Sequence, residues 1–219
     1  MMIRPEWYYE EYLKGKTVEQ ITTTIRGLKR EIGRLKKILE HPYYECSICP
    51  GEGVQLAMYV EYLEQAKLAL AEVGGVYVPT KEDQRIAEFN ANLAHMDKIT
   101  FEYGQSLGNT KIRTVKVYGD GLTLQTSSRF SLEGESETVE VKDKQAFITC
   151  LQKLNIGGWC RYYDTYRYGV AVMDGDFWEV KISFTNGKRA VKFHGNNAYP
   201  YNFGKLQELF DDFWLDADV

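Results

Sequence analysis

Hydrophobic residues recur at alternating spacings of three and four between residues 18 and 39. This pattern is typical of an α-helix with one narrow apolar stripe that packs against another helix. The stripe comprises Val18, Ile21, Ile25, Leu28, Ile32, Leu35 and Leu39. Thr17 and Gln20 have the spacing of a capping box, and His41-Pro42 ends the pattern. The sequence therefore predicts one long helix from about residue 18 to residue 40.

A second helical pattern follows from about Val54 to Val73 and ends at Gly74-Gly75. Its apolar positions are Leu56, Val60, Leu63, Ala66, Leu70 and Val73. Two helices of similar length joined by a loop of about a dozen residues predict an antiparallel hairpin, in which the first stripe packs against Leu56, Val60, Leu63 and Leu70. A third, shorter helix is expected from a Thr80 cap to about Leu93.

From Asp97 onward the hydrophobic period changes from helical to alternating, which is typical of β-strands. We expect strands at 99–103, 112–117, 122–125, 137–141, 177–184 and 190–193, with helices at 143–154 and 203–214. Asn202 is the expected cap of the last helix. The strands and helices form two similar halves, a loose ββα duplication, packed as an antiparallel sheet with helices on one face. The fold class is therefore α+β, with a helical hairpin domain at 1–96 and a sheet domain at 97–219.

Composition and charge exclude several classes of protein. The net charge of −4 over 219 residues argues against a polycation built for nucleic acid. No apolar run approaches the roughly 18–20 residues that cross a bilayer, so we expect no membrane partner. The first residues lack the layout of a signal peptide, and the four cysteines show no disulfide-framework spacing. A cytoplasmic protein is expected.

The outer face of the first long helix is strongly basic. It carries Arg26, Lys29, Arg30, Arg34, Lys36 and Lys37, interrupted only by Glu31. Cations at this density fit a nucleic-acid backbone or an acidic protein surface. The alternative is a solvated back face, which hairpins of this type commonly carry.

A second candidate surface concentrates tyrosine and arginine near residue 165. Its members are Arg161, Tyr162, Tyr163, Tyr166, Arg167 and Tyr168. These residue types dominate binding hot spots because they bring a large contact area with a polar end. The alternative is a strand whose alternate rings are buried.

Catalytic and metal-binding signals are weak. Cys46 and Cys49 have the spacing of half a zinc site, but a structural zinc needs four ligands, so we expect no metal and no cofactor. The histidines, His41, His95 and His194, are outside any catalytic motif, so no enzymatic activity is expected. Acidic segments lie at 133–137 and 211–218. The second could mimic phosphates toward a nucleic-acid-binding protein, and the alternative is a frayed, solvated helix end.

Three segments resemble an uncharacterised family encoded on phages and conjugative elements of clostridial gut bacteria. They are 25–29, 61–67 and 195–203, the last reading Gly-Asn-Asn-Ala-Tyr-Pro-Tyr-Asn-Phe. Small mobile-element proteins without catalytic motifs are often inhibitors of host defence, such as anti-CRISPR proteins. The resemblance implies a non-enzymatic protein in a bacterial cytoplasm that binds a host protein or ribonucleoprotein complex. The alternative is an accessory protein of the element that binds nucleic acid directly. The oligomeric state is left open.

Overall fold

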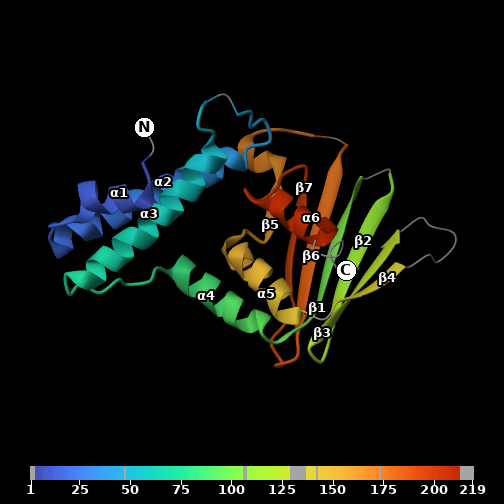
Figure 1. Cartoon of the computed structure of the whole chain (residues 1–219). Helices are drawn as coiled ribbons and strands as arrows, with labels where there is room; N and C mark the ends of the chain where they lie inside the picture. The colour runs from blue at the N-terminus through green and yellow to red at the C-terminus, as the bar shows by residue number, and fades with distance from the viewer. Residues whose placement is uncertain are drawn as a thin grey trace. The chain divides into compact units, whose positions relative to one another are not determined.

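A computed structural model describes residues 3–46, 48–105, 108–128, 137–141, 143–172 and 174–212. The chain divides into two compact units, Met1–Pro79 and Thr80–Val219, which we call the hairpin unit and the sheet unit. Both helices and strands are abundant, and the helices of the hairpin unit precede the sheet (Figure 1). The predicted α+β class is confirmed. Within the described residues, no helix has both the length and the apolar character that crossing a membrane requires.

The hairpin unit is built on α2 (Val18–Leu39) and α3 (Glu52–Glu72), which run side by side in opposite directions (Figure 1). The Thr17–Gln20 capping box opens α2 as predicted. The middle of the α2 stripe is buried, from Ile21 through Leu35, whereas Val18 at its start is 41% exposed. A short helix, α1 (Pro5–Tyr8), and the π-helical segment Tyr9–Leu13 complete the unit.

The predicted inner face of α3 is wrong at Val60. This residue is 43% exposed, whereas Tyr62 and Ala69, which were not predicted, are buried. The reason is that α3 packs against α1 as well as α2, which turns its buried face toward both. The ring of Tyr62 stacks on that of Tyr8 with centroids 4.1 Å apart, and the Tyr62 hydroxyl bonds the backbone of Ile3.

The sheet unit contains one seven-stranded sheet of order β4-β3-β2-β1-β6-β7-β5. The strands are β1 (Met96–Gln105), β2 (Thr110–Tyr118), β3 (Gly121–Ser128), β4 (Glu137–Val141), β5 (Tyr162–Asp164), β6 (Asp176–Phe184) and β7 (Val191–Asn196). Neighbouring strands are antiparallel except β5, which runs parallel to β7. The prediction of an all-antiparallel sheet is wrong at this edge. The chain enters β5 from a helical turn and not from a hairpin, so β5 is free to run parallel to β7.

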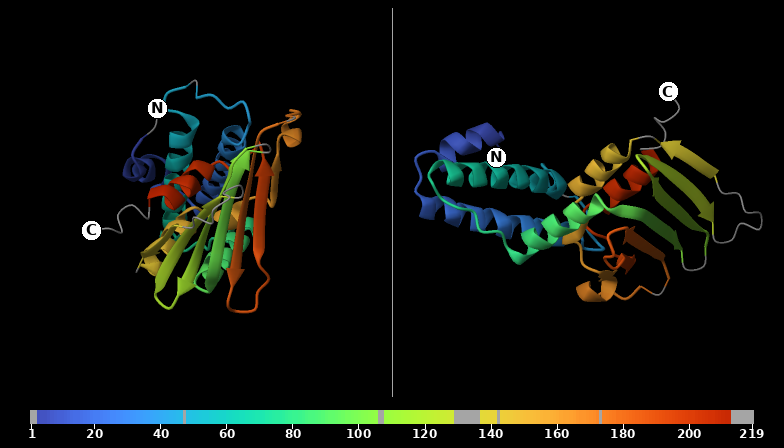
Figure 2. Two further views of the ribbon diagram at one scale, coloured as in Figure 1. Left: turned by 90° about the vertical axis from the view of Figure 1, so that its right-hand side faces the viewer. Right: turned by 90° about the horizontal axis from the view of Figure 1, so that it is seen from below.

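Three helices belong to this unit, α4 (Lys81–Leu93), α5 (Lys144–Lys153) and α6 (Phe203–Asp212), and they lie on one side of the sheet (Figures 1 and 2). Their buried residues share one core with the inward residues of the strands, including Phe101, Phe147, Trp178, Phe193 and Phe210. The two halves meet where β1 pairs with β6. The expected ββα duplication is only partial, since four strands precede α5, whereas three strands, β5 and the β6–β7 hairpin, lie between α5 and α6.

The boundary between the units lies at Pro79–Thr80 rather than at 96–97 as predicted. The cause is the packing of α4, whose Phe89 and Leu93 are buried in the sheet core. Asn90 also exchanges hydrogen bonds with Gln152 of α5, 3.1 Å and 3.4 Å long. The predicted Thr80 cap is present as a full capping box with Asp83.

Candidate functional site

The basic residues of α2 divide into two groups. Arg26, Arg30, Arg34 and Lys37 are exposed, and we call these four the basic ridge. Their spacings of four, four and three residues place them along one face of the helix, over about 16 Å of its axis. Within the ridge, Arg34 is held by Glu31 at 2.8 Å. A Cβ added to Gly27 or Gly33 would meet nothing within 4 Å, so the helix backbone beside the ridge is open.

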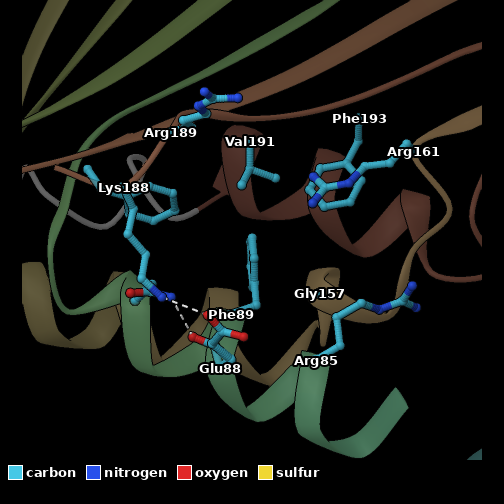
Figure 3. Close-up of a pocket in the computed structure, with 11 residues that line it drawn as sticks. Arg85, Glu88, Phe89, Gly157, Arg161, Lys188, Arg189, Val191 and Phe193 are labelled. Atoms are coloured by element: carbon cyan, nitrogen blue, oxygen red, sulfur yellow. Dashed lines mark hydrogen bonds and ion pairs between the residues drawn. The ribbon is translucent and has the colours of Figure 1, made fainter. Parts of the chain in front are cut away.

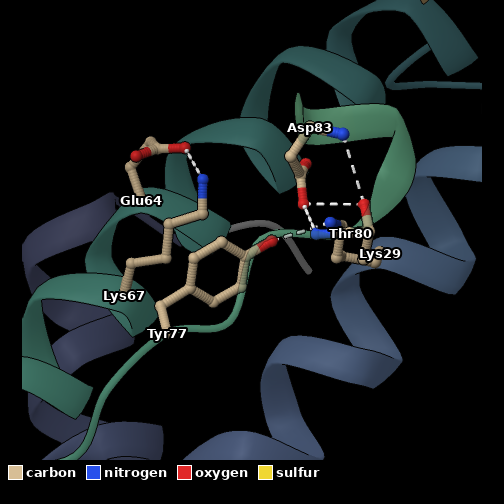
Figure 4. A network of polar contacts seen from close by, with 6 residues as sticks. All are labelled: Lys29, Glu64, Lys67, Tyr77, Thr80 and Asp83. Carbon is tan, nitrogen blue, oxygen red and sulfur yellow. Dashed lines mark hydrogen bonds and ion pairs between the residues drawn. The ribbon is translucent and has the colours of Figure 1, made fainter. Parts of the chain in front are cut away.

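Lys29 and Lys36 are half-buried and lie off the ridge. The ammonium of Lys29 donates a 2.7 Å hydrogen bond to the Tyr77 hydroxyl, and Lys67 lies 5.0 Å from the centre of the same ring (Figure 4). Lys67 in turn pairs with Glu64 at 2.7 Å. Lys29 therefore fastens the segment after α3 to the hairpin and is a poor candidate for partner binding.

The tyrosine–arginine segment does not form one surface. Tyr163 is 1% exposed, because alternate residues of β5 face the core, and its ring packs on Trp178 with centroids 5.8 Å apart. Its hydroxyl accepts a 3.1 Å bond from the Cys160 amide. The prediction that Tyr163 contacts a partner is therefore wrong. Arg167 also has a structural position, with its guanidinium 5.3 Å from the centre of the Tyr163 ring.

The other tyrosines of the segment lie nearer the surface. Tyr166 is 71% exposed and Tyr162 is 44% exposed, whereas Tyr168 is half-buried beneath Arg167. The Tyr162 ring lies 4.8 Å from that of His194 on the neighbouring strand. Tyr162 and Tyr166 remain candidates for contact with a partner.

Arg161 lines a cavity of about 170 Å³ between α4 and the β6–β7 hairpin (Figure 3). We call this site the cationic cavity. Four exposed cations surround it, namely Arg85, Arg161, Lys188 and Arg189. Phe89 and Phe193 are buried in its wall. Sequence reasoning found Arg161 alone of these cations, although the Lys188-Arg189 pair directly after the Asn186-Gly187 turn was a visible signal.

The electrostatics of the cavity are dominated by positive charge. Its one carboxylate, Glu88, is paired with Lys188 at 2.7 Å, and this pairing lowers the pKa of Glu88. Partial burial and the nearby charge of Arg85 lower the pKa of Arg161. Arg161 lies 4.8 Å from the centre of the Phe193 ring, in a cation–π contact that Figure 3 shows. The cavity therefore presents cations that its own carboxylate does not neutralise.

The segment 195–203, which carries the family resemblance, is structural. Trp178 donates to the Ala198 carbonyl at 2.8 Å, and Gly195 has no room for a Cβ because the Trp178 indole nitrogen would lie 2.6 Å away. Asn202 accepts from the Trp159 indole at 2.9 Å and donates to the Leu154 carbonyl at 2.7 Å. The predicted use of Asn202 as the cap of α6 is therefore replaced by these two buried bonds.

A carboxylate with two tyrosines lies at the start of β6. The hydroxyls of Tyr103 and Tyr199 donate to Asp176 at 2.7 Å and 3.2 Å. Burial, reinforced by the Asp176 charge, raises the pKa of both phenols above 10.0. Asp176 thus connects the start of β6 to β1 and to the segment that follows β7.

The remaining candidates from the sequence give no site. Cys46 and Cys49 are exposed free thiols, and no group of three or more metal-ligating side chains occurs within the described part of the chain. Asp211, in the acidic C-terminal segment, pairs with Arg113 of β2. Residues 133–136 and 213–219 lie outside the described residues.

No protein-family model, curated protein or solved structure matches the chain. The resemblance to proteins of phages and conjugative elements therefore stays a prediction from three sequence segments.

Proposed function

We propose that this is a non-enzymatic binding protein of a mobile element that inhibits a host nucleic-acid-handling complex through protein–protein contacts. The observation that carries the proposal is the basic ridge. Four exposed cations on a rigid helix form a preorganised surface for a strongly acidic partner. Complexes that handle nucleic acid contain polyanions and surfaces that bind them. A target of this kind fits the resemblance to mobile-element proteins.

The ridge is suited to this role because its geometry is fixed by the helix and not by loops. Its backbone is already ordered, so binding would cost mainly side-chain freedom. Of its four cations, Arg34 shares its charge with Glu31, which leaves three as the main electrostatic contacts. Exposed charges act through solvent, so the interaction should weaken as salt rises.

The second candidate function is direct binding of nucleic acid by an accessory protein of the element. The specific observation in its favour is the same linear spacing of the ridge, since cations along one helix face can neutralise successive phosphates. The two functions differ in what the ridge contacts.

The experiment reverses three charges of the ridge, R30E together with R34E and K37E. The matched control reverses three exposed lysines of the sheet unit, K111E with K181E and K205E, so both variants carry the same net charge. Each protein is used to capture partners from a clostridial lysate with and without nuclease. We expect the ridge variant to lose a nuclease-resistant protein partner that the control retains, with little change in stability in either variant.

Two results would contradict the leading proposal. If the ridge variant captures the partner as well as wild type at low salt, the ridge is a solvated back face. If only nucleic acid is recovered, and nuclease removes it, the accessory role is favoured. Replacing Tyr162 and Tyr166 by Ala in the same assay tests the second surface, where loss of binding should depend little on salt.

A further inference from the structure

The cationic cavity brings together charges from three separate segments of the sheet unit. Arg85 comes from α4, Arg161 precedes β5, and Lys188 and Arg189 follow β6 in the turn to β7. Lys188 is neutralised by Glu88. Among the described residues, neither Arg85 nor Arg161 is ion-paired to a carboxylate. The cavity is therefore a site of concentrated, uncompensated positive charge.

The two arginines are held in place by uncharged groups. Arg85 donates a 3.2 Å hydrogen bond to the Gly158 carbonyl, and Arg161 stacks on Phe193. Two guanidinium groups at one cavity repel each other, and a bound anion would offset this repulsion. Arginine favours phosphate because its planar fork offers paired N–H donors to two oxygens.

The size and walls of the cavity narrow the class of ligand. Its volume of about 170 Å³ is below the roughly 300 Å³ at which pockets for drug-sized ligands begin, so it holds one end of a ligand rather than the whole. The apolar part of the wall consists of Phe89, Phe184, Val191 and Phe193, of which Phe193 lies against Arg161. Such a wall favours a planar ring beside the anion over a polyhydroxylated chain.

We propose that the cationic cavity binds the phosphate monoester of a nucleotide, either free or at the end of a nucleic-acid strand. The phosphate would lie between Arg85 and Arg161, with the nucleoside directed along the phenylalanine wall. This inference goes beyond the proposed function, because the cavity and the basic ridge share no residue. Either can fail without the other.

The first test uses the full chain and calorimetric titration with adenosine monophosphate, adenosine, ribose 5-phosphate and inorganic phosphate. We expect adenosine monophosphate to bind at least tenfold more tightly than each of the other three. R85Q and R161Q should each weaken its binding at least tenfold, whereas the matched change K205Q on α6 should leave it unaltered. Unchanged melting temperatures in all three variants would establish that the losses are local.

Several results would overturn the proposal. If adenosine binds as tightly as adenosine monophosphate, the phosphate does not contribute to binding. If ribose 5-phosphate binds as tightly as adenosine monophosphate, the base does not contribute. A loss in K205Q as large as that in R161Q would show non-specific attraction. Binding should also weaken below about pH 6, where the phosphate takes up its second proton.

A second titration distinguishes the two sources of the phosphate. It compares a short single-stranded oligonucleotide carrying a 5′-phosphate with the same strand carrying a 5′-hydroxyl. A preference for the phosphorylated strand that R161Q removes identifies a strand end, and binding of the mononucleotide alone identifies a free nucleotide. The triple ridge variant should keep either preference, so failure here is distinguishable from failure of the proposed function. Absence of binding to every phosphate ligand would overturn the inference.

Discussion

The hairpin unit and the sheet unit carry positive charge in opposite ways. On α2 the cations of the basic ridge lie within twelve residues of sequence and are exposed along a regular helix. In the sheet unit the cations of the cavity are up to 104 residues apart in sequence, from Arg85 to Arg189. They meet only because α4, the segment before β5 and the β6–β7 hairpin pack together. The ridge is an open, linear surface, whereas the cavity has walls that enclose a small volume. The arrangement of the ridge cations is determined by local sequence, whereas that of the cavity cations is determined by the topology of the fold.

The two cores differ as well. The core of the hairpin unit is mainly aliphatic and follows one helical period, with Ile21, Ile25, Leu28 and Leu35 buried. The core of the sheet unit is largely aromatic and contains buried polar bonds, such as that between Trp159 and Asn202. The stability of the hairpin unit should therefore be most sensitive to a buried charge. The stability of the sheet unit should be most sensitive to the loss of specific hydrogen bonds.

The largest effect is expected from Leu28→Asp in the hairpin unit. Leu28 is 4% exposed, so the variant loses apolar packing and buries a carboxylate, at a cost of about 4 kcal/mol in the free energy of unfolding. Denaturant titration should show an early loss of far-UV circular dichroism. The fluorescence of Trp159 and Trp178 should still report a folded sheet unit. Val18→Asp, at the exposed first turn of α2, is the control, and coincident loss of both signals would show that the two cores act as one.

A smaller effect is expected from Asn202→Ala in the sheet unit. The change leaves the Trp159 indole N–H and the Leu154 carbonyl without their buried partner, which should cost about 3 kcal/mol. Here the tryptophan fluorescence should report the earlier unfolding. The exposed Asn109→Ala is the matched control and should change stability by less than about 0.5 kcal/mol. If the two changes lower the free energy of unfolding equally, the buried hydrogen bonds of Asn202 do not contribute to stability.

The smallest effect concerns pH. The pKa values of Tyr103 and Tyr199 are raised above 10.0 in the folded protein, so the folded state holds these protons more tightly than the unfolded chain does. Their contribution to stability is therefore complete below pH 10 and is lost as pH rises above it. Denaturation followed by tryptophan fluorescence should show a smaller loss between pH 10 and 11 in Tyr199→Phe than in wild type. The exposed Tyr166→Phe should retain the wild-type slope, and an unchanged slope in Tyr199→Phe would contradict the assignment.

The sequence predicted the elements whose signal is local. The α2 stripe, the capping boxes at Thr17 and Thr80, and the strand β4 were found where expected. Errors arose where a third element decides which face is buried. Val60 is exposed because α3 also packs on α1, and α4 joins the sheet unit because Phe89 and Leu93 enter its core.

The candidate sites follow the same division. The exposed part of the basic face was predictable because helical geometry orients every fourth residue alike. Sequence could not predict the burial of Tyr163 or the assembly of Arg85 with Arg161, because both depend on long-range packing. The sequence shows that tyrosines and arginines are concentrated near residue 165, but only the pairing of β5 with β7 determines which of them face solvent.

The segment 195–203 has a consequence for how this protein should be compared with others. Its residues are committed to internal bonds, with the Ala198 carbonyl, Asn197, Tyr199 and Asn202 all engaged by neighbouring strands or helices. A saturation mutagenesis scan would therefore score it as intolerant whatever the partner is. Chains sharing this segment should share the scaffold of the sheet unit while remaining free to diverge in the ridge and the cavity, so variation at Arg30, Arg34, Arg85 and Arg161 would be the better guide to differences in target.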